Sequence, residues 1–440
     1  MSYKILDKFS LTLKLKGYPL TRAKKKLKIV QNEKNISDYQ QSEKWKILNF
    51  HYKNNLHYRN FVGNKFPEKW KNVPVQTKSS IQAPIKDRFS DGFTKINTHI
   101  DNTSGSSGTP FYYAKDKFCH ALCWAIIKDR FSWHSVYNGS DLQARFYGIP
   151  KGKMRSFKEK IKDFILNRIR FPVFDLSNEI LDNFISKFYS NKFIYVNGYT
   201  SSLVIFAKYC IEKKIIIKEI CPTLKSVFTT SEVCDDIDKK TLEHGFGVPV
   251  VNEYGASELD IIGFEDRDGD WLVNYETLFV EILNSNNQAV KPGKQGRVVI
   301  TSLYNKAMPF IRYDIGDLAI LKKHKKSGYQ VLKRVLGRTN DIVLLPSGKK
   351  SAGLTFYYIS KKLLESGGFM REFIIIQKKL NHFHYQYVAN RLISNEEKKG
   401  VQDAMELYLE KGLKITFERK NKIKRNKSGK LKQFYSEINE

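Results

Sequence analysis

Residues 102–110 read NTSGSSGTP, and this stretch decides how the rest of the chain is interpreted. Three serines, two threonines and two glycines follow the alternating run TKINTHI. Such a loop presents backbone N–H groups and hydroxyls together and can form a concave anion site, which polyphosphate can approach closely because the residues are small. It is not a Walker loop, because Gly105 and Gly108 are too close together and no Lys-Ser/Thr pair follows. Ordinary turns have the same composition, so the prediction of a phosphate site depends on other segments.

The helical periodicity of the following run, KDKFCHALCWAIIKDRF, predicts that this loop lies before a helix, whose N-terminus would add partial positive charge to the phosphate site. Within the run, Cys119 and Cys123 are one turn apart and His120 lies between them. A zinc site would need further ligands at suitable spacing, and none is evident in the sequence. We therefore favour buried thiols in a helix over metal or redox chemistry.

Length and composition indicate a folded protein of two or three domains. The chain has 440 residues, of which 41% are hydrophobic and 13% aromatic, enough for substantial cores. No apolar run approaches the roughly 18 residues needed to span a bilayer. Lysines interrupt the N-terminal run MSYKILDKFSLTLKLKG too often for a signal peptide. We expect a cytoplasmic protein without a transmembrane segment.

The chain is strongly basic. Lys and Arg number 76 against 45 Asp and Glu, a formal net charge of +31. This charge favours polyanions, such as nucleotides, acidic sugars, an anionic membrane face or nucleic acid. The alternative, which we favour, is a lysine excess spread over a solvated surface. Nucleic acid is not expected, since no nucleic-acid-binding signature accompanies the charge, whereas peripheral contact with a membrane or another polyanion stays open.

The order of predicted elements indicates an α/β protein. Helical and β-rich runs alternate from residue 158 to 256, which suggests a sheet with covering helices. Residues 271–331 are rich in strands. We expect a large N-terminal domain with mixed sheets and covering helices, residues 1–336, and a small mobile α+β C-terminal domain, residues 337–440.

The C-terminal domain has its own signals. DIVLLPSG predicts a strand, and FYYISKKLLES predicts a helix. Ser394 and Glu397 have capping-box spacing and open a helix with one predicted apolar face; the face comprises Val401, Met405, Tyr408 and Leu409. Residues 413–417 alternate as a strand.

Four further segments accompany the first: YGASE (254–258), RYDIGD (312–317), GRTND (337–341) and SGK (428–430). Together the segments resemble the adenylate-forming superfamily of acyl-CoA synthetases, adenylation domains and luciferases. The sequence is more similar to the phenylacetate–coenzyme A ligase family, including its capsular-polysaccharide (CapK-like) branch. TSGSSGTP, VNGYTSSL, TTSEV, YGASE, MPFIRYDIGD and VLGRTND carry this resemblance, which runs from about residue 78 to residue 430.

The resemblance implies an ATP site with Mg²⁺. The loop would hold the β- and γ-phosphates through Thr103, Ser104, Gly105, Ser106, Ser107 and Gly108. Tyr254 would offer a flat face to adenine, with Gly255 and Ala256 leaving room beside it. Ser257 would donate to the α-phosphate and Glu258 would hold Mg²⁺, a cation that takes one or two carboxylates plus phosphate oxygens. In isolation, a core aromatic and a surface carboxylate are the alternatives for Tyr254 and Glu258.

Towards the C-terminus, the resemblance implies that Asp317 accepts hydrogen bonds from both ribose hydroxyls. It also implies that Arg338 contacts the ribose or a phosphate. Lys430 would enter the cleft and bridge the carboxylate substrate and the α-phosphate, a step that suits a flexible point charge. Without the resemblance, Lys430 would be one more lysine in a solvated tail. Relatives usually carry Asp or Lys two residues after the arginine. Asn340 stands there instead, followed by Asp341, so these two are the hinge candidates in 338–341.

The implied function is an ATP-dependent ligase that forms an acyl-adenylate and then passes the acyl group to a thiol, amine or sugar acceptor. Transfer during surface (capsular or O-antigen) polysaccharide synthesis is our leading version, and a coenzyme A thioester is the alternative. A catalytically silent polyanion-binding protein on the same scaffold is the alternative from another class. The acid itself is not predicted, although its pocket is expected near Tyr199, Trp124 and the strand before Tyr254.

Overall fold

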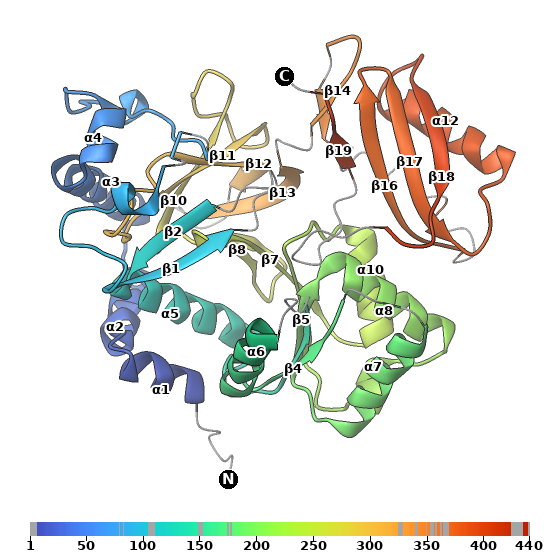
Figure 1. The fold of residues 1–440 in the computed structure, drawn as a ribbon. Coiled ribbons are helices and arrows are strands. Elements are labelled where there is room, and N and C mark those ends of the chain that lie inside the picture. The colour runs from blue at the N-terminus through green and yellow to red at the C-terminus, as the bar shows by residue number, and fades with distance from the viewer. Residues whose placement is uncertain are drawn as a thin grey trace. The chain divides into compact units, whose positions relative to one another are not determined.

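The computed structural model describes most of the chain (Figure 1). The described residues are 7–78, 80–81, 83–103, 111–147, 153–173, 176, 178–323, 329–338, 342–348, 350–352, 356, 359–360, 363, 369–423 and 434–438. The chain separates into two compact units, one formed by Met1–Ile315 with Ala319–Val335 and the other by Gly316–Leu318 with Leu336–Glu440. The assignment of ATP and acyl binding to residues 1–336, and of the catalytic lysine and hinge to residues 337–440, stays a prediction.

The first unit begins with four helices, three of which have a side-chain N-cap. They are α1 (Lys8–Leu15), α2 (Leu20–Gln31), α3 (Ile36–Asn54) and α4 (Leu56–Val62), followed by 3₁₀ turns at Trp70–Asn72 and Ile85–Arg88. Asp7, Asn35 and Asn55 accept hydrogen bonds from the backbone at the starts of α1, α3 and α4, which satisfies N–H groups that the helices leave free.

A β-hairpin carries the Ser/Gly loop. Strands β1 (Thr98–Thr103) and β2 (Phe111–Asp116) pair antiparallel, and helix α5 (Lys117–Trp133) follows directly. The helix predicted at KDKFCHALCWAIIKDRF is confirmed, and strand β2 precedes it. Asp116 caps α5 by accepting from the N–H groups of Phe118 and Cys119. The N-terminus of that helix is thus already satisfied by this chain's own carboxylate.

The next elements build a parallel sheet with helical crossovers, as the alternating pattern predicts. They are β3 (Gln143–Phe146), α6 (Lys153–Ile165), β4 (Arg168–Phe171), α7 (Asn178–Ser190), β5 (Tyr195–Tyr199), α8 (Thr200–Glu212), α9 (Ile217–Ile220), β6 (Ser226–Thr230), α10 (Asp236–Phe246) and β7 (Val250–Ala256). The strands β4, β3, β5, β6 and β7 are neighbours in that order and run parallel. Phe146, Phe171, Phe184 and Phe206 pack in the core between these strands and their helices.

The sheet becomes antiparallel after β7. Its remaining strands are β8 (Asp260–Glu265), β9 (Trp271–Val273), β10 (Leu278–Leu283), β11 (Gln295–Ser302), β12 (Tyr313–Lys323) and β13 (Gln330–Arg338). Strand order is β10-β11-β12-β13-β9-β8-β7-β6-β5-β3-β4. Strand β7 is parallel to β6 and antiparallel to β8, so the end of β7 lies where the sheet changes direction. This is the predicted mixed sheet with covering helices.

The second unit is a small α+β domain, as predicted. Strands β16 (Met370–Lys379), β17 (His382–Ala389), β18 (Lys414–Arg419) and β19 (Phe434–Ser436) form a sheet of order β18-β17-β16-β19. The unit also contains helix α12 (Asn395–Tyr408) and a separate strand pair, β14 (Ile342–Leu344) and β15 (Lys350–Ala352). Most of the helix predicted at FYYISKKLLES lies outside the described residues.

Helix α12 confirms the capping box. The Ser394 hydroxyl accepts from the Glu397 N–H, while the Glu397 carboxylate accepts from the Ser394 N–H. Val401, Met405 and Leu409 are buried, as predicted. Tyr408 is 48% exposed, so its assignment to the apolar face is wrong. In the part of the chain that the structure describes, no helix is both long and apolar enough to cross a bilayer.

Candidate functional site

The predicted adenine and magnesium segment forms the turn between β7 and β8. Strand β7 ends at Ala256 and β8 begins at Asp260, with the N–H of Leu259 bonded to the Ala256 carbonyl at 3.0 Å. Gly255 lies against this turn, and a Cβ there would come within 2.5 Å of the Asp260 carbonyl oxygen. Glycine is therefore required for the hairpin to close, in addition to the room that it leaves beside Tyr254.

Within this turn, Glu258 is held by a tyrosine from another strand. Its side chain is buried, and its Oε1 accepts a hydrogen bond of 3.0 Å from the hydroxyl of Tyr313 at the start of β12. Its Oε2 has no hydrogen bond to any described residue. The arrangement fixes one carboxylate oxygen and leaves the other available to a cation. A carboxylate oxygen is the kind of ligand that Mg²⁺ prefers.

The neighbours of Glu258 differ in exposure. Tyr254 is only 8% exposed and its ring lies edge-on to Trp271, with centroids 6.2 Å apart. Gly255 and Ser257 are exposed. A nucleotide can therefore approach the backbone and the Ser257 hydroxyl directly, next to a tyrosine whose orientation is fixed by packing.

Lys115 joins the loop-bearing hairpin to this turn. The Lys115 ammonium, on β2, donates to the Ser257 carbonyl oxygen at 3.1 Å and forms an ion pair with Asp260. Burial alone would lower the pKa of Lys115, but the Asp260 charge outweighs it and raises the pKa well above its usual range. Burial would raise the pKa of Asp260, and Lys115 lowers it on balance. Both groups therefore stay charged, and the hairpin is held against the Tyr254–Glu258 segment.

Further contacts anchor the base of the same hairpin. Arg88 donates to the Tyr112 carbonyl oxygen, and its guanidinium lies 4.9 Å from the centre of the Phe111 ring. Asn305 donates to the Ala114 carbonyl oxygen at 2.9 Å. Thr103 and Phe111 are paired across the two strands, so the ends of the Ser/Gly loop are fixed side by side. Residues 104–108 lie outside the described residues.

The residues of the segment RYDIGD have two kinds of role: one stabilises the fold and another positions a residue of the site. Arg312 is 1% exposed and donates to the carbonyl oxygens of Lys71, Val73 and Asn287, a structural role that ties the early helical region to the sheet. Tyr313 positions Glu258. Asp317 also lies on β12, in the short stretch Gly316–Leu318 that belongs to the second compact unit. Its binding of ribose stays a prediction.

The remaining predicted residues have less structural support. Arg338 ends strand β13. Asn340, Asp341 and Lys430 lie outside the described residues, so the hinge and the catalytic lysine stay predictions.

The structure adds a polar cluster that the sequence did not indicate, at the carboxyl ends of the parallel strands. Arg145 on β3 lies 3.7 Å from the centre of the Tyr147 ring and donates to Asn197 Oδ1 on β5 at 3.3 Å. The rings of Tyr147 and Tyr199 are 4.4 Å apart. Ligands of open α/β sheets bind at this edge, which makes the cluster a candidate wall of the acyl pocket.

Glu253 completes this polar cluster and directly precedes Tyr254. Its Oε1 accepts a hydrogen bond of 2.8 Å from Thr230 on β6. Burial raises the pKa of the Glu253 carboxyl, against the lowering effects of Thr230 and the Arg145 charge. Of the residues expected to line the pocket, Tyr199 belongs to this cluster. Trp124 packs instead with Phe9 in a different hydrophobic cluster.

Helix α5 holds the cysteine pair as predicted. Cys119 is buried and Cys123 half-buried, and both are free thiols. Within the described ranges, no group of three His, Cys, Asp or Glu side chains is arranged to hold a metal ion. A lone carboxylate such as Glu258 is compatible with Mg²⁺, since that cation usually keeps waters and takes substrate phosphates.

Sequence comparisons point in one direction. No protein-family model matches the chain. Protein CapK from Staphylococcus aureus is 25% identical over 290 residues, covering 62% of this chain and 61% of CapK. A phenylacetate–coenzyme A ligase from Thermus thermophilus is 31% identical over 122 residues, covering 24% of this chain and 26% of the ligase. The chain thus spans less than two thirds of the length of these curated relatives.

Solved structures share the fold at low identity. A 2-hydroxyisobutyryl-CoA ligase in the postadenylation state, in complex with an acyl-AMP, matches with a TM-score of 0.65 at 17% identity, over 90% of this chain and 88% of the ligase. An anthranilate CoA ligase in complex with anthranoyl-AMP matches with a TM-score of 0.52 at 13% identity, over 76% of this chain and 64% of that ligase. These similarities establish the fold.

Proposed function

The chain belongs to the adenylate-forming superfamily, in the branch that contains CapK and the phenylacetate–coenzyme A ligases, and on that premise we propose that it activates a small carboxylate with ATP. The reaction is a ligation in two halves. In the first, a carboxylate oxygen attacks the α-phosphorus of ATP, the bond to the β-phosphate oxygen breaks, and pyrophosphate leaves. In the second, an acceptor takes the acyl group and AMP leaves.

The contact between Tyr313 and Glu258 carries this proposal. It fixes a carboxylate with one oxygen available at the end of β7, while Lys115 holds the loop-bearing hairpin to the same turn. Three segments far apart in the chain therefore converge in one unit. A carboxylate beside a phosphate-binding loop would suit Mg·ATP, because carboxylate and phosphate oxygens are ligands that Mg²⁺ prefers.

We assign the chain's own residues to the first half-reaction as follows. Glu258 holds Mg²⁺, which when bound neutralises charge on the phosphates, and the loop 103–108 donates to the β- and γ-phosphates. Ser257 donates to the α-phosphate. Tyr254 presents the adenine side, and Asp317 and Arg338 take the ribose end. Lys430 approaches the α-phosphate, where negative charge concentrates as the carboxylate attacks.

The polar cluster of Arg145, Tyr147, Tyr199 and Glu253 forms the acyl side of the site in this proposal. Glu253 and Tyr254 are consecutive residues of β7, so the proposed acyl and adenine sides of the site are neighbours on this strand. A pocket with a guanidinium, two phenols and a carboxyl favours an acid that carries polar groups. A purely aliphatic acid would add no hydrogen bonds to those that Arg145 and Glu253 already form with Asn197 and Thr230, so this lining favours it less.

The acceptor has two versions. The similarity to CapK and the strongly basic chain support transfer to an amine or hydroxyl of a sugar precursor in surface-polysaccharide synthesis. The similarity to phenylacetate–coenzyme A ligases supports a coenzyme A thioester. Incubation with ATP, the activated acid and either coenzyme A or an amino sugar, followed by mass spectrometry of the products, separates the two.

Carboxylate-dependent exchange of labelled pyrophosphate into ATP tests the first half-reaction across a panel of acids. We expect exchange with acids that bear hydroxyl or amide groups, and little with unsubstituted fatty acids. A chain that binds polyanions without exchanging pyrophosphate on any acid would instead be the catalytically silent scaffold.

A further inference from the structure

Helix α6 is oriented with its charged face towards the protein. Glu159 and Asp163 lie one turn apart and pair with arginines of the adjacent strand β4. Arg170 Nη2 lies 2.8 Å from both carboxylates, and Arg168 Nε lies 2.5 Å from Asp163. The exposed fractions of the two arginine side chains are only 8% and 9%. A surface helix normally buries its apolar stripe and exposes its charges, whereas α6 turns Glu159 and Asp163 towards β4.

The apolar side chains of α6 therefore face outward. Phe157, Ile161 and Phe164 follow one another at helical spacing and are 64%, 45% and 69% exposed. The neighbouring helix α1 adds Leu11 and Leu15, which are 47% and 81% exposed. We call these five residues the apolar crest. The ammonium of Lys8 on α1 lies 3.9 Å from the centre of the Phe164 ring, which places the two helices side by side (Figure 1).

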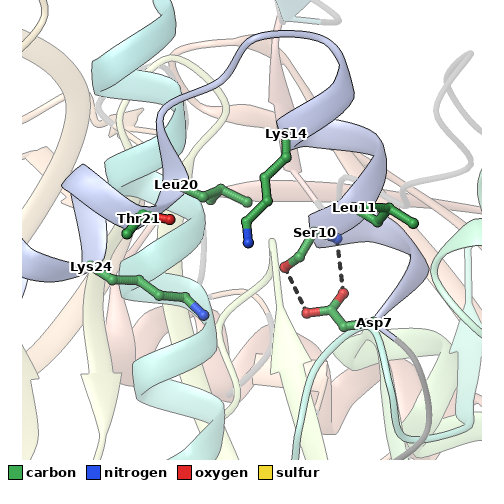
Figure 2. A pocket seen from close by; sticks show the side chains of 7 residues that line it. All are labelled: Asp7, Ser10, Leu11, Lys14, Leu20, Thr21 and Lys24. Carbon is green, nitrogen blue, oxygen red and sulfur yellow. Dashed lines mark hydrogen bonds between the residues drawn. The ribbon is translucent and has the colours of Figure 1, made fainter.

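Lysines surround the apolar crest. Lys14 on α1, Lys160 and Lys162 on α6, and Lys16 directly after α1 are exposed. Beside the crest, α1 and α2 enclose a hollow of about 390 Å³ lined by Asp7, Ser10, Leu11, Lys14, Leu20, Thr21 and Lys24 (Figure 2). Asp7 is already engaged by Ser10 and Lys128. Lys14 and Lys24 form no ion pair with any residue in the described ranges, so two ammonium groups are available at this hollow.

We propose that α1 and α6 form a docking face for an anionic lipid bilayer. The apolar crest enters the boundary between headgroups and acyl chains, as the apolar faces of interfacial helices do. The surrounding lysines, including Lys14 and Lys24 at the hollow, contact the phosphates of anionic headgroups. A second copy of this chain fits the face poorly, because a two-fold contact would bring the same lysines against one another.

Co-sedimentation of the full chain with lipid vesicles tests this proposal. We expect binding to vesicles of phosphatidylcholine mixed with an equal part of phosphatidylglycerol, weaker binding as salt is raised, and little binding to phosphatidylcholine alone. The affinity of the variant Phe157→Ser/Phe164→Ser for these vesicles should fall by about ten-fold or more. Lys14→Glu and Lys24→Glu should each weaken binding by about five-fold or more.

Matched variants elsewhere control for general effects of exposed apolar and basic residues. Leu407→Ser replaces an exposed leucine of α12, and Lys294→Glu replaces an exposed lysine in a turn before β11. Both should bind vesicles as the unaltered chain does. All variants should keep carboxylate-dependent pyrophosphate exchange in solution, which separates failure of this proposal from failure of the proposed ligase.

Three results would overturn the proposal. The first is equal binding to neutral and anionic vesicles, or no binding to either. The second is unchanged binding by Phe157→Ser/Phe164→Ser. The third is concentration-dependent self-association, measured by sedimentation velocity, that this variant abolishes without any effect of lipid; the crest would then be an interface between copies of the chain.

Discussion

The hydroxyl of Tyr313 donates a hydrogen bond of 3.0 Å to Oε1 of Glu258, joining the start of β12 to the turn after β7. One oxygen of the carboxylate is thereby fixed in direction. Tyr313 is 1% exposed and packs against Phe310, with ring centroids 5.3 Å apart, so the donor itself has little freedom. The orientation of the proposed magnesium ligand thus depends on a residue outside the YGASE segment.

Tyr313→Phe should weaken the use of Mg·ATP without unfolding the chain. A hydrogen bond to a charged group contributes about 1.5–3 kcal/mol, which corresponds to roughly a ten- to hundred-fold effect. We expect the concentration of Mg²⁺ needed for half-maximal pyrophosphate exchange to rise, as measured by magnesium titration at fixed ATP. Tyr209→Phe is the matched control, because it removes a tyrosine hydroxyl on α8 that donates a hydrogen bond of 2.8 Å to Asp182. Equal effects of the two substitutions would contradict a role for Tyr313 at the metal.

Lys115→Met should destabilise the first unit, because it leaves Asp260 charged and without its main partner. Removing one member of a buried ion pair costs about 3–5 kcal/mol, and thermal unfolding followed by circular dichroism measures the loss. Lys322→Met is the control, since its pair with Asp270 is 47% and 28% exposed and should contribute about 1 kcal/mol or less. Lys115→Met/Asp260→Asn should recover part of the stability. A double variant no more stable than Lys115→Met would show that the charge on Asp260 is not the cause.

Arg145→Gln should raise the KM for the carboxylate substrate about ten-fold or more, since a hydrogen bond to a charged group is lost, and leave the KM for ATP nearly unchanged. The reason is the proposed assignment of Arg145 to the acyl side of the site, with ATP assigned to the Tyr254–Glu258 turn. Arg267→Gln, at an exposed arginine, controls for the loss of positive charge. Parallel changes in both KM values would place Arg145 outside the acyl pocket.

The stability of the first unit should fall in mild acid through His51. This side chain is fully buried between Ser90 Oγ at 2.9 Å and the Asn305 carbonyl oxygen at 2.8 Å, and burial lowers the pKa of His51 from 6.5 to about 4. Its neutral form stabilises the fold fully above pH 6.5. As the pH falls from 6.5 to 4, the unfolded chain takes up a proton that the folded chain does not, which removes about 3 kcal/mol.

Urea unfolding of the unaltered chain and of His51→Gln measures this effect. The unaltered chain should be the more stable at pH 7, and its advantage should shrink steadily towards pH 4. A difference in unfolding free energy that is the same at both pH values would contradict the assignment.

The sequence predicted those features that local patterns encode. The capping box at Ser394 and Glu397 and the strand that ends at YGASE needed only nearby residues. The helix at KDKFCHALCWAIIKDRF was also predicted, whereas the strand β2 before it was not, because its six residues carry no alternation that separates them from the helical run.

Contacts between distant segments could not be predicted in the same way. Arg145, Tyr199 and Glu253 meet only because β3, β5 and β7 end at the same edge of a parallel sheet. Tyr313 lies in the segment RYDIGD, which the sequence identified. Its hydrogen bond to Glu258 nevertheless depends on how the fold brings the start of β12 to the turn after β7. The outward stripe of α6 also escaped notice, since its periodicity alone suggests burial. Only the arginines of β4 show why the acidic face turns inward.

The most direct test of the central claim is carboxylate-dependent pyrophosphate exchange by the unaltered chain, Glu258→Gln and Lys430→Ala. We predict exchange that requires both an acid and Mg²⁺, and a loss of about 10²–10³-fold or more in each variant, the scale of removing one transition-state electrostatic contact. No exchange by the unaltered chain with any acid of the panel would contradict the assignment of this chain as a carboxylate-activating ligase, and exchange at the normal rate by Lys430→Ala or Glu258→Gln would contradict the role assigned to that residue.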